Sequence, residues 1–214
     1  AAILGAECFG FGTAPMIDEN AGKVPEVPAG LSPRALRKSN VASNYVIDHP
    51  LSSFAETLRS AKIAADLTLA GKDCKVIGIV STLPGEGKST TAINFAELLA
   101  SQGARTVLID GDLRNPGATR AIGLHAEEGI LEAILEKKPV GDLLLYNPQT
   151  KLAFLPAVIK RRVPHSPELF GSLAMRDILT SLSAEAAYII IDLPPLGALV
   201  DARAAADRYH GFFS

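Results

Sequence analysis

Residues 81–90 have the composition of a phosphate-binding loop. They read Ser-Thr-Leu-Pro-Gly-Glu-Gly-Lys-Ser-Thr, which is a Walker A pattern with Thr82 in place of its first glycine. Glycines allow backbone N–H groups to approach phosphate oxygens, Lys88 can reach the β- and γ-phosphates of a nucleotide, and the Ser89 hydroxyl can ligate Mg²⁺. The alternative is a glycine-rich turn with a solvated lysine. The predicted nucleotide-binding residues are Pro84, Gly85, Glu86, Gly87, Lys88, Ser89 and Thr90.

Three aspartates follow two apolar runs further along the chain. Asp110 and Asp112 come after residues 106–109, and Asp192 comes after residues 188–191. The carboxyl ends of parallel strands share one edge of a sheet, so these acids should converge on the phosphate loop. Mg²⁺ needs few protein carboxylates, so Asp192 would act on it directly or through water. Asp110 and Asp112 could ligate the metal or accept a hydroxyl proton. A single strand-terminal aspartate is more often a turn or helix cap, but three together favour a site.

The elements that must hold these residues follow from the hydrophobic pattern. Helices are predicted at residues 51–70 with Gly71 as C-cap, 90–102 ended by Gly103, 129–136 and 167–183. Strands are predicted at residues 75–80, 106–109, 152–155 and 188–191. Strands alternate with helices and are apolar on both faces. The predicted fold is therefore α/β, a P-loop NTPase-type parallel sheet covered by helices on both faces.

Composition limits the classes of partner. The net charge is −2 and the pI about 6.1, so no basic field recruits nucleic acid. Tryptophan is absent and aromatic residues are 6% of the chain, which argues against stacking surfaces for single strands. Cys8 and Cys74 cannot form a disulfide framework, so a reducing compartment is expected. No nucleic-acid partner is predicted.

Residues 1–45 are expected to precede the nucleotide-binding domain, which we assign to residues 46–214. Residues 1–17 are small and apolar but shorter than the ~20 residues of a membrane span. They are either an N-terminal core element or the remnant of a membrane-spanning helix. Residues 18–44 contain three prolines and four basic residues without a hydrophobic period. That composition predicts a linker.

Together the motifs resemble those of the bacterial tyrosine kinases (BY-kinases), the cytoplasmic kinase domains of polysaccharide co-polymerases. Residues 82–90 look like their Walker A motif, residues 107–116 like their second Walker motif, and residues 188–195 with 200–202 like their Walker B region. Weaker matches are residues 128–131 and 164–169, and the resemblance covers about residues 50–213. It implies transfer of the ATP γ-phosphate to a tyrosine hydroxyl. The implied catalytic residues are Lys88, Asp110, Asp112 and Asp192, and the implied Mg²⁺ ligands are Ser89, Asp110 and Asp192.

The resemblance also implies partners and a location. Glu56, Arg59 and Lys62 match the family's Glu-x-x-Arg-x-x-Arg helix, which packs between subunits, with lysine replacing the last arginine. A homo-oligomer is therefore expected, with a ring as one arrangement. A co-polymerase membrane domain would lie in the same or a partner chain, at the cytoplasmic side of the bacterial inner membrane. The implied role is the control of exopolysaccharide chain length, polymerisation or export.

Two departures from the family keep other functions open. The C-terminal tyrosine cluster is missing, since the four tyrosines are dispersed and Tyr188 lies in a predicted core strand. The family also continues past Ala206 with a β-strand, so the last strands of the sheet are expected to be truncated. One alternative is a non-catalytic ATP-binding module that gates a co-polymerase. Another is a partitioning-type ATPase, although those usually carry a second lysine where this chain has Leu83.

Overall fold

Short apolar runs of the chain pair into one twisted sheet. The computed structural model describes residues 2–3, 6–9, 32–39, 41–160, 169–195 and 211–213. The strands are β1 (Ala2–Ile3), β2 (Ala6–Phe9), β3 (Lys75–Ile79), β4 (Thr106–Asp110), β5 (Leu145–Tyr146), β6 (Ala153–Leu155), β7 (Tyr188–Asp192) and β8 (Gly211–Phe213). Their order is β1-β2-β8-β3-β7-β4-β6-β5.

The pairing of the central strands sets the position of the acids. β7 lies between β3 and β4 and is parallel to both. In this register Asp110 is the partner of Asp192, and Asp192 is also the partner of Ile79, the last residue of β3. The four predicted strands are confirmed, and their carboxyl ends meet at one edge of the sheet. Antiparallel pairing is confined to β1 with β2 and β5 with β6 among the described strands.

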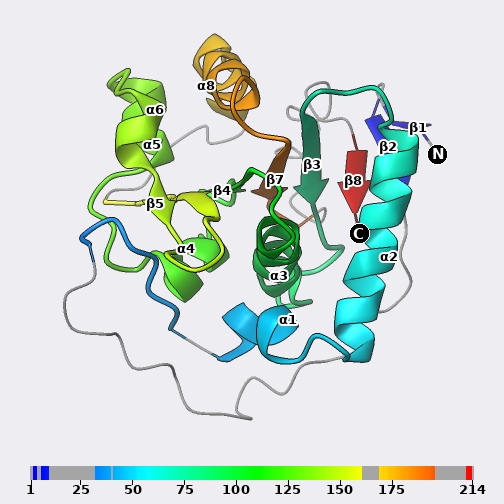
Figure 1. Cartoon of the computed structure of the whole chain (residues 1–214). Coiled ribbons are helices and arrows are strands. Elements are labelled where there is room, and N and C mark those ends of the chain that lie inside the picture. The colour runs from blue at the N-terminus through cyan, green and yellow to red at the C-terminus, as the bar shows by residue number, and fades with distance from the viewer. Residues whose placement is uncertain are drawn as a thin grey trace.

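Helices cover both faces of the sheet, which confirms the predicted α/β architecture (Figure 1). One face carries α1 (Tyr45–Asp48), α2 (Ser53–Thr68), α3 (Lys88–Ser101) and α4 (Gly117–Ile122), and the other carries α5 (Ile130–Leu135), α6 (Val140–Leu143) and α8 (Leu173–Ser183). Along β7, Ile190 joins one apolar core, while Ile189 and Ile191 join the other. Burial on both faces explains why these strands are continuously apolar.

Capping residues place the starts of two helices at positions that differ from those predicted by the hydrophobic periodicity. Ser52 accepts a hydrogen bond from the Ala55 backbone N–H, so α2 begins at Ser53 and not at residue 51. Ser172 caps α8 in the same way through the Met175 N–H. This helix therefore begins at Leu173, later than the predicted residue 167, and residues 161–168 lie outside the described residues.

The structure describes only short parts of the N-terminal run, and its assignment as a membrane-helix remnant stays a prediction. Residues 2–3 and 6–9 are strands, and β2 pairs in parallel with β8. A short run of small apolar residues is compatible with a strand as well as a helix, so periodicity could not separate the two. No described helix has the length and hydropathy to cross a membrane. β8 supplies a strand after Ala206, where the sequence predicted that the family's next strand begins.

The second half of the predicted linker is packed against the sheet. We name residues 32–39 the strap. Ala35 and Leu36 are buried, and Ala35 forms a parallel bridge with Tyr146 of β5. The Leu36 N–H donates to the Tyr146 carbonyl at 2.9 Å, and the Tyr146 N–H donates to the Arg34 carbonyl at 2.8 Å. The packed unit therefore extends to residues before the predicted boundary at residue 46. Backbone hydrogen bonds hold the strap in place. Because such bonds do not depend on residue type, the sequence of the strap shows no hydrophobic period.

Candidate nucleotide-binding and catalytic site

The loop between β3 and α3 is shaped by two glycines. Gly85 and Gly87 have φ values of +85° and +82°, which side chains other than glycine rarely adopt. Gly87 is the N-cap of α3, so the helix begins at Lys88 and not at the predicted residue 90. The Leu83 N–H donates to Glu86 Oε2 at 2.9 Å across the loop. This geometry is that of a phosphate-binding loop at a helix N-terminus.

Lys88 lies between two of the predicted catalytic acids. Its Nζ is 2.9 Å from Asp192 Oδ1, 3.1 Å from Asp112 Oδ2 and 3.4 Å from Ser89 Oγ. Burial by itself would lower the pKa of Lys88, but the charges of Asp192 and Asp112 outweigh burial and raise it. The lysine is therefore charged, and its charge is compensated by two carboxylates.

Asp110 is held by hydrogen bonds from its surroundings. Its Oδ2 accepts from both the Thr119 N–H and the Thr119 hydroxyl at 2.7 Å, and its Oδ1 accepts from the Asp112 N–H at 3.2 Å. The Thr119 hydroxyl oxygen in turn accepts from the Ala157 N–H at 2.8 Å. Burial first, and then the charge of Asp192, raise the pKa of Asp110 to about 7. Hydrogen bonds through Asp110 and Thr119 therefore connect β4, α4 and the segment after β6.

The carboxylate of Asp192 indicates whether the site could bind a metal ion. Its Oδ2 is buried, and no hydrogen-bond donor among the described residues reaches it. Burial raises the pKa of Asp192, although Lys88 and Ser89 act in the opposite direction. A buried carboxylate oxygen without a donor, next to a serine hydroxyl, fits Mg²⁺ or a water bound to it. The described residues contain no cluster of three or more His, Cys, Asp or Glu placed to hold a metal. Ser89 and Asp192 would hold a Mg²⁺ ion here with phosphate oxygens and water, and Asp110 as a further ligand stays a prediction.

A pocket of about 500 Å³ opens above these residues, within the range of ligand pockets. Six of the seven predicted loop residues line it, together with Asp112. Glu86 is the exception, and its carboxylate accepts a hydrogen bond from the Leu83 N–H, so its contact with the nucleotide stays a prediction. The other lining residues are Arg114, Asn115, Gly117, Arg120, Pro194 and Pro195.

Helix α4 supplies site residues that the sequence did not predict. Arg120 lines the pocket, Thr119 holds Asp110, and Gly117 packs against the loop. A Cβ atom on Gly117 would lie 2.3 Å from Ser89 Oγ, so only glycine allows this approach. α4 is six residues long and has no apolar stripe. Its place directly after the second Walker motif is the one signal that could have found it.

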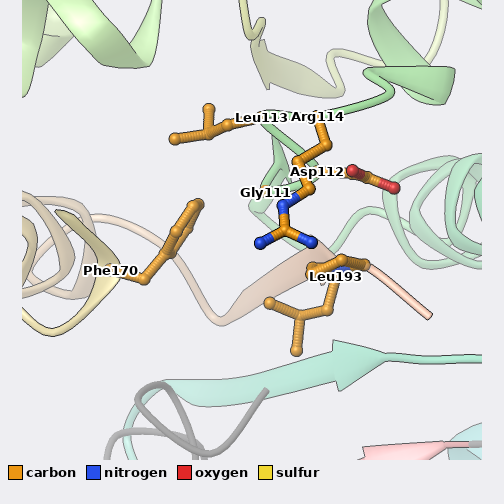
Figure 2. Close-up of a pocket in the computed structure, with 7 residues that line it drawn as sticks. Gly111, Asp112, Leu113, Arg114, Phe170 and Leu193 are labelled. Carbon is orange, nitrogen blue, oxygen red and sulfur yellow. The ribbon is translucent and has the colours of Figure 1, made fainter. Parts of the chain in front are cut away.

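A second, smaller recess adjoins the pocket at the ends of β4 and β7. Its volume is about 10 Å³, roughly the space of one water molecule. Figure 2 shows Phe170, Leu113 and Leu193 around it, with the Arg114 guanidinium directed toward Leu193. Asp112, Arg114 and Pro194 line both spaces, so the recess is an extension of the nucleotide pocket.

The predicted subunit-contact residues form pairs within α2. Arg59 pairs with Glu56 and also donates to the Pro50 carbonyl, while Lys62 lies 2.6 Å from Asp66. Ile63 and Leu67 of the same helix are 60% and 74% exposed. An exposed apolar surface of this kind is compatible with a subunit contact, which stays a prediction.

Known proteins share these motifs and this fold. The family described as "AAA domain" matches residues 74–208. Tyrosine-protein kinase YwqD of Bacillus subtilis is 32% identical over 174 residues, which cover 79% of this chain and 72% of YwqD. The chain belongs to the bacterial tyrosine kinase family. The succinoglycan biosynthesis transport protein ExoP of Rhizobium meliloti is 43% identical over 170 residues, and the match spans 22% of ExoP.

The fold comparison agrees with this membership. The crystal structure of the chimerical protein CapA2B2 superimposes with a TM-score of 0.72 at 26% identity, covering 80% of this chain and 75% of that one. The chain also matches the chromosome partitioning protein ParA of Myxococcus xanthus, with 40% identity over 148 residues that cover 62% of this chain and 50% of ParA. The likeness to bacterial tyrosine kinases therefore extends over more of the chain.

Proposed function

We propose that this chain is an ATP-dependent protein-tyrosine kinase domain that regulates exopolysaccharide chain length, polymerisation or export. The observation that carries the proposal is the Lys88 ammonium between Asp192 and Asp112, at the floor of a nucleotide-sized pocket behind the glycine loop. The similarity to YwqD supports the reaction, and the similarity to ExoP supports the biological setting. In that setting the domain acts at the cytoplasmic side of the inner membrane, beside a co-polymerase membrane domain, and assembles as a homo-oligomer.

The residues present can perform phosphoryl transfer by positioning and charge neutralisation. The loop amides and Lys88 bind the phosphate chain, so negative charge that develops on the leaving oxygen is met by fixed donors. The acceptor tyrosine oxygen bonds to the γ-phosphorus while the bond to the β–γ bridging oxygen breaks, and ADP leaves. The tyrosine proton passes to a carboxylate, for which Asp112 at the pocket wall is the candidate. Mg²⁺ bound at Ser89 and Asp192 would supply further neutralisation of phosphate charge.

The acceptor tyrosine is expected to come from another molecule. Tyr188 is buried in β7 and its hydroxyl donates to Asp66, so it cannot enter the pocket. Tyr45 of α1 and Tyr146 of β5 are not among the residues that line the pocket. An external acceptor is therefore the appropriate substrate for a first assay.

A phosphotyrosine assay tests the proposal. The chain is incubated with Mg-ATP and a random copolymer of glutamate and tyrosine, and phosphotyrosine is measured by blot. We expect Lys88→Met to lower the signal by about 100-fold, because it removes a cation that binds the transferring phosphate. Lys72→Met is the matched control, since Lys72 is exposed and distant from the pocket, and it should retain the wild-type signal.

The other outcomes distinguish the alternatives. ATP binding by the wild type without phosphotyrosine in any variant would contradict the kinase and favour a non-catalytic ATP-binding module. ATP hydrolysis stimulated by DNA or by a membrane partner, again without phosphotyrosine, would favour a partitioning-type ATPase. The ParA similarity supports this second candidate, while Leu83 at the place of the second loop lysine argues against it.

A further inference from the structure

Arg120 is a cation of the pocket that neither the motifs nor the proposed mechanism uses. It lines the pocket together with Asn115 and Gly117, and the residue is exposed. None of the described residues forms an ion pair or a hydrogen bond with its guanidinium. A guanidinium is charged at every physiological pH, so the pocket contains one full positive charge without a counter-charge among these residues.

The other cations of the pocket differ from Arg120 in this respect. Lys88 is shared by two carboxylates, Asp112 and Asp192. Arg114 already has an interaction partner. A nucleotide triphosphate carries several negative charges, and Lys88 alone cannot balance both its own acids and the phosphates. Mg²⁺ would balance part of the phosphate charge, and the Arg120 guanidinium at the pocket can balance a further part.

Arg120 is also close to the residues that receive the phosphates. The position that a Cβ atom on Gly117 would occupy is 2.3 Å from Ser89 Oγ and 3.9 Å from Arg120 Nη2. The Ser89 hydroxyl and the Arg120 guanidinium therefore both lie within 4 Å of the same point. A phosphate oxygen bound near the Ser89 hydroxyl would lie within reach of this guanidinium.

The backbone that carries Arg120 is fixed on both sides. Thr119, the preceding residue, is bonded to Asp110 through its N–H and its hydroxyl. On the opposite side, the Ser39 hydroxyl of the strap donates to the Arg120 carbonyl at 3.0 Å and the Ser39 N–H donates to the Ala121 carbonyl at 2.7 Å. A residue held in this way starts from a defined backbone position, which reduces the entropy lost when its side chain binds.

We propose that Arg120 binds the phosphate chain of the nucleotide together with Lys88, as a further phosphate-binding residue of the kinase. The inference rests on the proposed function and adds a residue to that site. The planar guanidinium can donate two parallel hydrogen bonds to phosphate oxygens, which a lysine cannot do. The competing assignment is that Arg120 binds acidic residues of the acceptor polypeptide.

The test measures the Kd of Mg-ATP by isothermal titration for the wild type, Arg120→Ala, Arg120→Lys and Arg176→Ala. We expect Arg120→Ala to raise the Kd by about tenfold, below the full strength of a charged hydrogen bond because the pocket is open to solvent. Arg120→Lys should fall between Arg120→Ala and the wild type. Arg176→Ala is the matched control, since Arg176 is exposed on α8, and it should bind as the wild type does. Thermal unfolding of each variant verifies its folding.

Salt dependence separates direct contact from a general loosening of the pocket. If Arg120 contacts phosphate, the Kd of the wild type should rise more steeply with salt than that of Arg120→Ala. Equal Mg-ATP affinity of Arg120→Ala and the wild type would overturn the inference and leave the proposed function intact. If Arg120→Ala leaves the Kd of Mg-ATP unchanged but raises the KM for the glutamate–tyrosine copolymer, the inference is also overturned. That result would show that Arg120 binds the acceptor polypeptide. Absence of ATP binding by the wild type would overturn the proposed function and the inference with it.

Discussion

Lys38 of the strap forms a buried ion pair with Glu97 of α3, and replacing it with methionine should destabilise the domain. Lys38 Nζ is 2.9 Å from Glu97 Oε1, and the Glu97 side chain is fully buried. Glu97 also accepts hydrogen bonds from Asn147 Nδ2 and the Thr150 hydroxyl, each at 2.7 Å. The Lys38→Met variant keeps the apolar stem of the side chain and removes the charge.

The expected cost follows from these contacts. Removing one partner of a buried ion pair costs about 3–5 kcal/mol, because it leaves a charge without compensation. The Lys38 side chain is 13% exposed and two neutral donors to Glu97 remain, so we expect a loss of about 2–3 kcal/mol in the free energy of unfolding. For a chain of this length the melting temperature should fall by about 5–10 °C.

Urea unfolding followed by circular dichroism measures this change. Lys72→Met is the control for removal of an exposed lysine and should remain within about 0.5 kcal/mol of the wild type. The double variant Lys38→Met with Glu97→Gln should lose less than the sum of the two single variants, because no buried charge is left unpaired. If Lys38→Met unfolds at the same urea concentration as the wild type, the strap is not part of the cooperative unit and the reasoning is refuted.

Three further outcomes are expected. Gly117→Ala should weaken Mg-ATP binding by about tenfold, because its Cβ would displace the Ser89 hydroxyl. Thr119→Val should cost about 1–3 kcal/mol of stability, since buried Asp110 loses a donor at 2.7 Å. Burial alone would raise the pKa of Asp66, but hydrogen bonds from two lysines and a tyrosine hold it below its ordinary value of 3.8. Its contribution to stability should therefore be present above about pH 4 and lost as the pH falls further.

Each of these has a measurement that can contradict it. Gly141→Ala is the control for Gly117→Ala because its Cβ meets nothing within 4 Å, and equal ATP affinity of the two variants would contradict the steric argument. For Thr119, an unchanged urea midpoint in Thr119→Val would show that the hydroxyl is dispensable. For Asp66, the stability difference between the wild type and Asp66→Asn is measured from pH 7 to pH 2.5. A difference that does not shrink with acid would refute the assigned pKa direction.

The central elements were predictable because their patterns are strong. β3, β4 and β7 are short, apolar and flanked by turn residues, and the acids that follow them could be assigned to one sheet edge by the parallel topology. The glycine loop was recognisable because the chemistry of phosphate binding restricts its residue types. Helix α2 was predicted from its periodicity, and its start was displaced only by the Ser52 cap.

The hydrophobic patterns missed the strap, helix α4 and the N-terminal strands. The strap is bound to the sheet through backbone hydrogen bonds at Tyr146. Backbone hydrogen bonds do not depend on residue type, so the sequence does not reveal them. Helix α4 has six residues, too few to show a period. Residues 1–17 have a composition that fits a helix or a strand equally well, and the pairing of β2 with β8 required a partner more than 200 positions away in the chain.

By itself, the sequence determined the parallel α/β sheet, the phosphate loop and the three convergent acids, because local hydrophobic pattern and residue chemistry specify them. Only the tertiary structure decided which side chain each of these aspartates contacts. Asp112 and Asp192 hold Lys88, whereas Asp110 is bonded to Thr119. It also decided that Arg120 enters the pocket and that the strap packs on α4. These are distances between side chains brought together by folding, and no spacing along the chain encodes them.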